Sequence, residues 1–146
     1  MITILEKFGK LRRKLNLLFT QALSPLGIGP KQAVLLRYLS TRGESSLADI
    51  SRATVTDPAA VNRSVAVLIK KGMIQRREHA TDQRRWQVSL TRKGKGQAME
   101  VEKIYAATAE KMVEGLLPRE KEAFAALLDK MLASFSPNKF FKEGKN

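Results

Sequence analysis

Apolar residues recur at every third or fourth position near both ends of the chain, which is the period of one face of an α-helix. Residues 2–23, 92–116 and 118–135 each carry such a stripe, and Pro118 suits the first turn of the last segment. The sequence therefore predicts long amphipathic helices at both ends. The residues expected to face inward are Leu5, Phe8, Leu11, Leu15, Leu18, Phe19, Ala22, Ala98, Val101, Ile104, Tyr105, Thr108, Met112, Leu116, Phe124, Leu127, Leu128, Met131 and Phe135.

Shorter helices are predicted in the middle of the chain. One begins at Pro30 and ends at Gly43; a second, short helix follows Ser46 as its N-cap. After a tight turn, Asp57 can cap a third helix with Pro58 in its first turn. In that helix we expect Val61, Val65 and Leu68 to face inward, and Ala59, Asn62, Arg63, Ala66 and Lys70 to face outward. This pattern is typical of a helix-turn-helix, although any helical hairpin in a bundle would produce it too.

Gly72 ends the helical pattern, and period-two alternation begins directly after it. Met73 and Ile74 begin one predicted strand, while Trp86, Val88 and Leu90 alternate along a second. The polar loop between them carries Arg84 and Arg85. Such a charged hairpin is suited to a nucleic-acid groove, and the alternative is an ordinary solvated turn.

The charge of the chain favours a polyanionic partner. Its 146 residues include 27 Lys or Arg against 14 acidic residues, a net charge of +13, with 43% apolar residues, as in a globular protein. Residues 46–95 hold eleven basic and four acidic residues, so about half of the excess, +7, lies in a third of the chain. Nucleic acid is the commonest partner of so basic a protein, and a solvated basic surface is the alternative.

Several function classes find no support in the sequence. Without Cys, the chain has no disulfide or thiol chemistry, and His79 is its single histidine, so we expect no metal site and no cofactor. No phosphate-binding glycine loop or paired-carboxylate signature is present, so we do not expect an enzyme. No apolar run approaches the ~20 residues of a membrane span, and the first residues lack the order of a signal peptide. We therefore expect a cytoplasmic protein that does not bind membranes.

With these elements in order, the chain resembles the MarR family of winged helix-turn-helix transcription regulators over essentially its whole length. The matching motifs are LADIS (47–51), VNRSVAVLIKKGMI (61–74), the Asp-x-Arg of the hairpin loop (82–84) and SLTRKG (89–94). The resemblance implies a fold that is mainly α with a small β-hairpin wing. A winged helix-turn-helix domain would span residues 30–96, and a helical dimerisation lobe would comprise residues 1–23 and 97–146.

The resemblance also implies a homodimer on pseudo-palindromic, double-stranded operator DNA. Each recognition helix, about residues 58–71, would enter a major groove, and each wing would reach the adjacent minor groove. The apolar stripes of the terminal helices agree with this, because they carry more apolar surface than a monomer of this length easily buries, and a two-fold dimer is the commonest oligomer. Half-sites would lie about one helical turn apart.

Candidate DNA contacts lie in the recognition helix and the wing. We expect Arg63 to bridge guanine O6 and N7, the alternative being a phosphate contact alone. Asn62 is a candidate for a base or phosphate contact, Thr56 and Ala59 for close approach to DNA, and Ala59 and Ala60 for a thymine methyl.

In the wing, Arg84 is expected in the minor groove and Arg85 on a phosphate. The resemblance implies that Asp82 orients Arg84. We expect Trp86 to pack at the base of the wing.

The sequence thus favours a sequence-specific regulator, a repressor in the first instance, whose DNA binding responds to a small anionic or aromatic ligand. The resemblance implies a ligand site between the dimerisation lobe and the winged domain, but the sequence does not identify its residues. Arg12 and Arg13 are candidates for an anionic ligand, with a basic solvent-exposed face as the alternative reading. The competing function is that of a non-specific architectural or RNA-binding protein, which the high pI would also allow.

Overall fold

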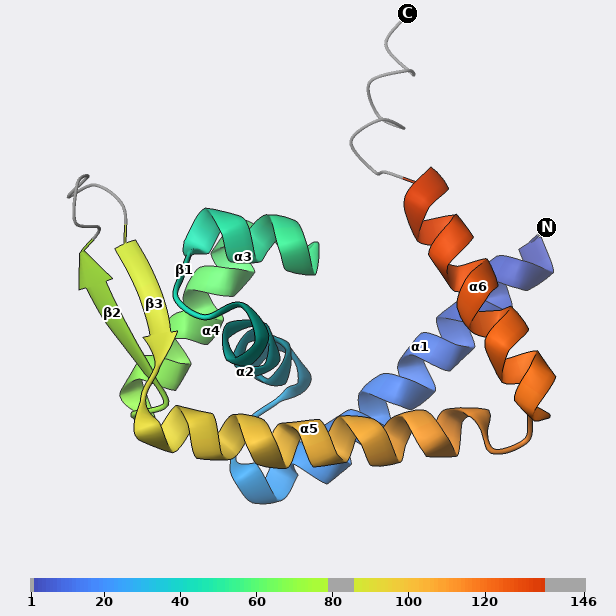
Figure 1. Ribbon diagram of the computed structural model, residues 1–146, viewed down its shortest axis with the longest axis horizontal. Helices are drawn as coiled ribbons and strands as arrows, with labels where there is room; N and C mark the ends of the chain where they lie inside the picture. The colour runs from blue at the N-terminus through green and yellow to red at the C-terminus, as the bar shows by residue number, and fades with distance from the viewer. Residues whose placement is uncertain (1, 79–85, 136–146) are drawn as a thin grey trace, which may run out of the picture. The chain divides into compact units, whose positions relative to one another are not determined.

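A computed structural model describes residues 2–78 and 86–135 of the chain, and it is largely helical with one small sheet (Figure 1). Two compact units are present, Met1–Thr108 and Ala109–Asn146. The fold class expected from the sequence is confirmed. The elements are α1 (Ile2–Leu23), the 3-10 helix η1 (Ser24–Leu26), α2 (Pro30–Arg42), β1 (Ser45–Ser46), α3 (Leu47–Thr54), α4 (Pro58–Lys70), β2 (Ile74–Glu78), β3 (Trp86–Leu90), α5 (Arg92–Val113) and α6 (Pro118–Ser134).

The core of the first unit lies where α2, α3 and α4 meet the sheet and the first half of α5. The predicted inward face of α4 is confirmed, since Val61, Val65 and Leu68 are buried. Ala60 is buried as well, with 6% of its surface exposed. It therefore packs in the core, and the expectation that it could meet a thymine methyl is wrong. The largest fully buried side chains are Leu23, Leu36, Ile50, Leu68, Ile74, Val88 and Val101.

The sheet has three antiparallel strands in the order β1-β3-β2, so the predicted hairpin gains an additional strand. Ile74 pairs with Leu90 and Glu78 with Trp86, which fixes the register of β2 and β3. The expected alternation holds for Val88 and Leu90, which are buried, whereas Trp86 is 38% exposed because the core ends before it. The sequence did not indicate β1, since two serines carry no hydrophobic alternation.

Helices α1 and α6 form within one residue of the predicted bounds, whereas α5 ends at Val113, before the predicted end at residue 116. The apolar faces of α1 and α6 are only partly covered within one chain. On α1, Leu5 is 75% exposed and Phe8 is 39% exposed. On α6, Leu127 and Met131 are likewise exposed, and no residue of that helix is buried. The prediction that these side chains face inward is therefore wrong for the single chain. By contrast, α5 buries Ala98, Val101 and Thr108 as expected. The prediction is wrong for Met112, which is exposed because it lies near the end of α5, beyond the core.

Candidate nucleic-acid interface

The predicted caps position the two helices of the helix-turn-helix. The Ser46 hydroxyl accepts a hydrogen bond from the Asp49 amide at 3.1 Å at the start of α3. The Asp57 carboxylate accepts one from the Ala60 amide at 3.2 Å, with Pro58 in the first turn of α4. These side chains satisfy amides that the first turn of a helix leaves free, and both helices therefore begin at defined residues.

The turn between α3 and α4 is closed by its own hydrogen bonds. The Thr56 amide donates to the Ser51 carbonyl at 3.0 Å, and the Ser51 hydroxyl donates back to the Thr56 carbonyl at 2.5 Å. The Thr56 hydroxyl lies 3.2 Å from the Thr54 carbonyl and 3.0 Å from the Thr54 hydroxyl. Thr56 is half-buried and its hydroxyl is engaged inside the turn, so the structure gives this predicted DNA-contact residue a local role.

The outward face of α4 presents the other residues predicted for this helix. Ala59, Asn62 and Arg63 are all exposed, and no hydrogen bond or ion pair within the described residues engages the Asn62 or Arg63 side chain. They lie three and four positions apart, so they share the helix face opposite Val61 and Val65. A small residue beside an amide and a guanidinium allows a helix to approach the base edges of a major groove closely.

A set of backbone contacts joins α4 to α5. The Thr91 amide donates to the Met73 carbonyl at 3.0 Å, and the Thr91 hydroxyl donates to the Gly72 carbonyl at 2.6 Å. The same hydroxyl accepts from the Gly94 amide at 3.1 Å, which caps the start of α5. A Cβ on Gly94 would lie 1.9 Å from the Met73 carbonyl oxygen. This close approach explains the Thr and Gly of the SLTRKG motif and couples the end of α4 to α5.

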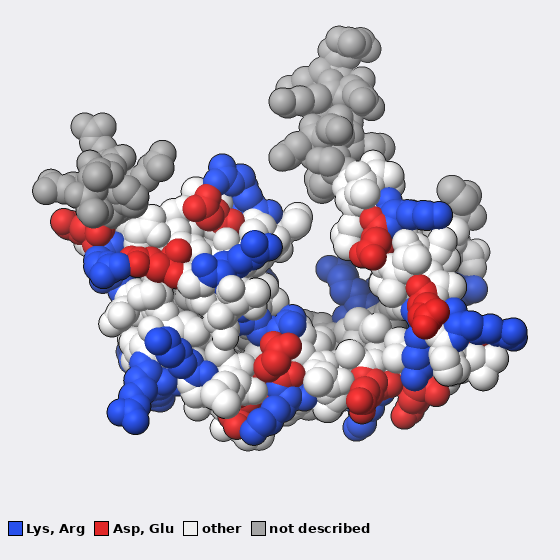
Figure 2. Space-filling model, viewed as in Figure 1, with Lys and Arg blue, Asp and Glu red and all other residues white. Residues whose placement is uncertain are grey.

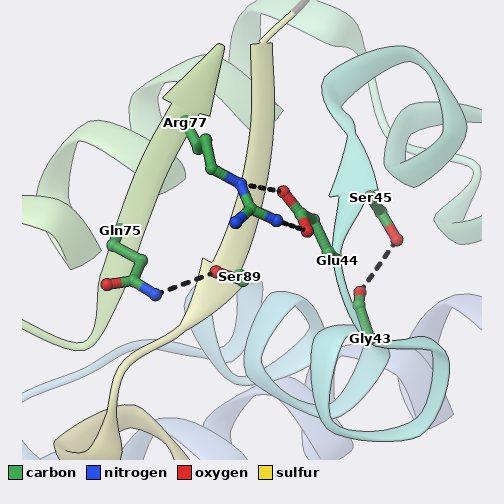
Figure 3. A network of polar contacts seen from close by, with 6 residues as sticks. All are labelled: Gly43, Glu44, Ser45, Gln75, Arg77 and Ser89. Atoms are coloured by element: carbon green, nitrogen blue, oxygen red, sulfur yellow. Dashed lines mark hydrogen bonds and ion pairs between the residues drawn. The ribbon is translucent and has the colours of Figure 1, made fainter. Parts of the chain in front are cut away.

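Side-chain hydrogen bonds connect β2, at the base of the wing, to the residues around it (Figure 3). The pair of Arg77 and Glu44 is called the clamp. Arg77 on β2 reaches across the sheet to Glu44, with Nε 3.0 Å from Oε1 and a second contact between Nη2 and Oε2. The hydrogen bond to Glu44 raises the pKa of Arg77. Gln75 donates to Ser89 at 3.3 Å on the neighbouring strand. This clamp was not predicted from the sequence, because its partners are 33 residues apart.

The predicted wing-tip residues Asp82, Arg84 and Arg85 lie outside the described residues, as does His79. Their expected roles stay predictions. At the edge of the described part of the wing, the Arg76 guanidinium lies over the Trp86 ring, 4.5 Å from its centroid. Trp86 therefore packs at the base of the wing as expected, but beneath a cation rather than in the core.

A second polar cluster connects α2 to α5 and α1. Arg37 makes two hydrogen bonds to Glu102, at 2.8 and 3.1 Å, and its guanidinium lies 4.0 Å from the Tyr105 ring centroid. Tyr105 in turn packs against Phe19 at a centroid distance of 4.6 Å. The hydrogen bond from Arg37 lowers the pKa of Glu102, and burial raises the pKa of Tyr105.

Basic side chains are not confined to the outward face of α4. Figure 2 shows Lys and Arg side chains projecting where α4 ends and α5 begins. Lys70, Arg92 and Lys95 are exposed there, and the Lys93 ammonium donates to the Lys71 carbonyl at 2.9 Å. Lys93 thereby satisfies a carbonyl at the end of α4. This corner lies a full helix length, about 18 Å, from the first residues of α4.

A hollow of about 550 Å³ lies along α1. Its lining residues in the described part of the chain are Arg12, Arg13, Asn16, Leu17 and Thr20. Two guanidiniums beside an amide suit an anionic group. The Thr20 hydroxyl already donates to the Asn16 carbonyl at 2.7 Å. No cluster of three or more potential metal ligands occurs among the described residues, and none of the helices that the structure describes is long and apolar enough to cross a membrane.

Comparison with known proteins agrees with this geometry. The model of the MarR family matches residues 26–85. A curated HTH-type transcriptional repressor of Mycobacterium bovis is 28% identical over 110 residues, which cover 75% of this chain and 79% of that protein. The crystal structure of the S. aureus MepR–DNA complex is 26% identical with a TM-score of 0.83, covering 89% of this chain and 96% of that one. A structure of Bordetella bronchiseptica BpsR, whose DNA binding is regulated by 6-hydroxynicotinic acid, is 25% identical with a TM-score of 0.82 and covers 88% and 98% of the two chains.

Proposed function

From the premise that this chain belongs to the MarR family of transcriptional regulators, we propose that it is a homodimeric repressor of pseudo-palindromic operator DNA. The observation that carries the proposal is the outward face of α4, where Ala59, Asn62 and Arg63 are exposed directly after a capped, hydrogen-bonded turn. The S. aureus relative in complex with DNA and the repressor of M. bovis support the same role. This role belongs in the cytoplasm, where bacterial DNA lies.

In this proposal the protein reads bases with α4 and the minor groove with its wing. Arg63 bridges guanine O6 and N7, and Asn62 contacts a base or a phosphate. Arg84 enters the minor groove with Asp82 as its brace, and Arg85 contacts a phosphate. The clamp between Glu44 and Arg77 supports this arrangement, because it fixes the strands from which the wing loop leaves.

The exposed apolar faces of the terminal helices support a homodimer. On α1, Leu5 and Leu17 are 75% and 60% exposed; on α6, Leu127 and Phe135 are 58% and 65% exposed. Apolar surface of this extent on helices otherwise well formed is characteristic of a protein–protein contact. A two-fold dimer would present two copies of α4 to half-sites about one helical turn apart.

We propose further that a small anionic or aromatic ligand changes the DNA affinity. The Arg12 and Arg13 guanidiniums at the hollow on α1 support an anionic group. The regulation of the B. bronchiseptica relative by an aromatic acid supports the ligand class.

Selection from a random duplex library by the purified full chain tests the function. Recovered sequences should share a pseudo-palindrome, and the chain should bind a recovered duplex at least 10³-fold more tightly than a scrambled one at physiological salt. Equal affinity for the recovered and the scrambled duplex, or equal affinity for an RNA duplex, would establish the alternative of a non-specific architectural or RNA-binding protein. In the same assay, 6-hydroxynicotinic acid should weaken binding to the recovered duplex, with its amide 6-hydroxynicotinamide as the matched neutral control.

A further inference from the structure

The turn between α3 and α4 holds a valine in a conformation that valine disfavours. Val55 has φ +50° and ψ +45°, and no other non-glycine residue in the described ranges has a positive φ. In this left-handed region the Cβ crowds the following carbonyl, and a second branch at Cβ makes the crowding worse. Glycine or asparagine would occupy the position with less strain.

Nothing within residues 2–78 and 86–135 explains why a valine stands there. Its side chain is 81% exposed, so packing does not hold it in place. The turn is closed instead by the hydrogen bonds between Ser51 and Thr56, in which the Val55 side chain has no part. Strained residues held by the surrounding structure are concentrated at functional sites. An exposed, strained and apolar residue therefore suggests a contact with something outside the chain.

The position of Val55 indicates what that contact is. Pro58 and Ala59, in the first turn of α4, are exposed apolar residues as well. Asp57, between them and Val55, is exposed too, but its carboxylate caps the helix by accepting from the Ala60 amide. In the major groove the apolar feature of the base edges is the C5-methyl group of thymine. A basic or polar tip would bind phosphates, whereas the side chains of Val55, Pro58 and Ala59 carry no polar group that could do so.

We propose that Val55, together with Pro58 and Ala59, forms an apolar tip that contacts thymine methyl groups next to the bases read by Arg63. The inference rests on the proposed function, since it requires α4 to enter the major groove. Full burial of one methyl changes affinity by about fourfold, so the two contacts of a homodimer give at most about 16-fold, and partial burial against DNA gives about tenfold. The strain at Val55 thus lowers the stability of the free protein, while its side chain adds a preference for sites with thymine at that position.

Val55→Asn and Val55→Gly test the tip, because both relieve the strain and remove the methyl groups. The melting temperature should rise by about 3 °C in Val55→Asn. Affinity for a duplex selected by the wild-type chain should fall by about tenfold. Met99→Gln is the matched control, because it replaces an exposed apolar residue of α5. The affinity of this variant for the selected duplex should equal that of the wild-type chain.

Deoxyuridine identifies the group that is contacted. Replacing the thymines of the selected duplex by deoxyuridine removes only their methyl groups, and the wild-type chain should then lose about the same tenfold. Val55→Asn should lose little more on the deoxyuridine duplex, since a contact already absent cannot be removed twice. Affinity unchanged in Val55→Asn, or a loss that deoxyuridine does not reproduce, would overturn the tip while leaving duplex recognition intact. A wild-type chain that selects no sequence would instead overturn the proposed function and the tip with it.

Discussion

At the scale of single residues, Arg37 shows how one side chain can connect three helices. It donates to Glu102 on α5 and lies over Tyr105, which packs against Phe19 of α1. The hydrogen bond lowers the pKa of Glu102 below its ordinary value of 4.5. A lowered carboxyl pKa means that the folded state prefers the carboxylate. The contribution to stability is therefore present above about pH 4.5 and lost as the pH falls through the lowered value.

Glu102→Gln should consequently destabilise the protein at pH 7 and much less at pH 3. Both partners are largely in water, so the expected loss at pH 7 is about 0.5 kcal/mol. Urea unfolding of wild type and variant at the two pH values measures this difference. Glu100→Gln is the control on the same helix; its partner Lys103 is a neighbour in sequence and does not link two elements. A Glu102→Gln effect of equal size at both pH values would contradict the assignment.

At the scale of the elements, the junction between α4 and α5 depends on the absence of a side chain. Gly94 is buried, and α5 approaches the Met73 carbonyl so closely that a Cβ would overlap it. Thr91 ties the same segment to Gly72. A shift of α5 would therefore be transmitted to the end of the recognition helix and to the first strand of the wing.

Gly94→Ala should destabilise the protein by about 3 kcal/mol, because backbone atoms must move to admit the methyl group. Gly96→Ala is the matched control two residues later, where a Cβ would meet nothing within 4 Å. There the better helix propensity of alanine should stabilise the protein by about 1 kcal/mol. Denaturant unfolding of the two variants should give changes of opposite sign. Two changes of the same sign would show that the close approach is absent.

Element boundaries were predictable where a side chain determines them. Ser46, Asp57 and Pro58 marked the starts of α3 and α4 because capping and proline geometry depend on local residue type. Strand β1 and the Glu44–Arg77 clamp were not predictable, since both depend on segments brought together only by the fold. Among the site residues, the exposed face of α4 followed from helical period, whereas the strain at Val55 depends on a backbone angle that composition does not reveal.

At the scale of the whole molecule, the terminal helices leave apolar side chains exposed. The stripes of α1 and α6 were expected inside the chain, but Leu5, Leu127 and Phe135 remain exposed. A helical period of apolar residues shows that one face of a helix is apolar, but it does not show which chain buries that face. A second copy of this chain is the covering that we propose.

Light scattering should therefore give a mass of about twice 16.3 kDa for the protein in solution. Leu127→Lys should shift it toward the monomer, because a charge would enter the apolar stripe of α6. Ala126→Lys adds the same charge on the opposite face of that helix, outside the stripe, and should leave the mass unchanged. A wild-type mass of 16.3 kDa would contradict the dimer.

The central claim is that α4 reads base sequence, and Arg63→Ala tests it most directly. Competition between the selected duplex and a scrambled duplex should show the preference falling by about 10- to 100-fold, as expected for the loss of an arginine contact to guanine. Binding to the scrambled duplex should change little, and Lys70→Ala, at the far end of the same helix, should keep the preference. If Arg63→Ala weakened binding to both duplexes equally, Arg63 would contact only phosphate and the account of base recognition by α4 would be wrong.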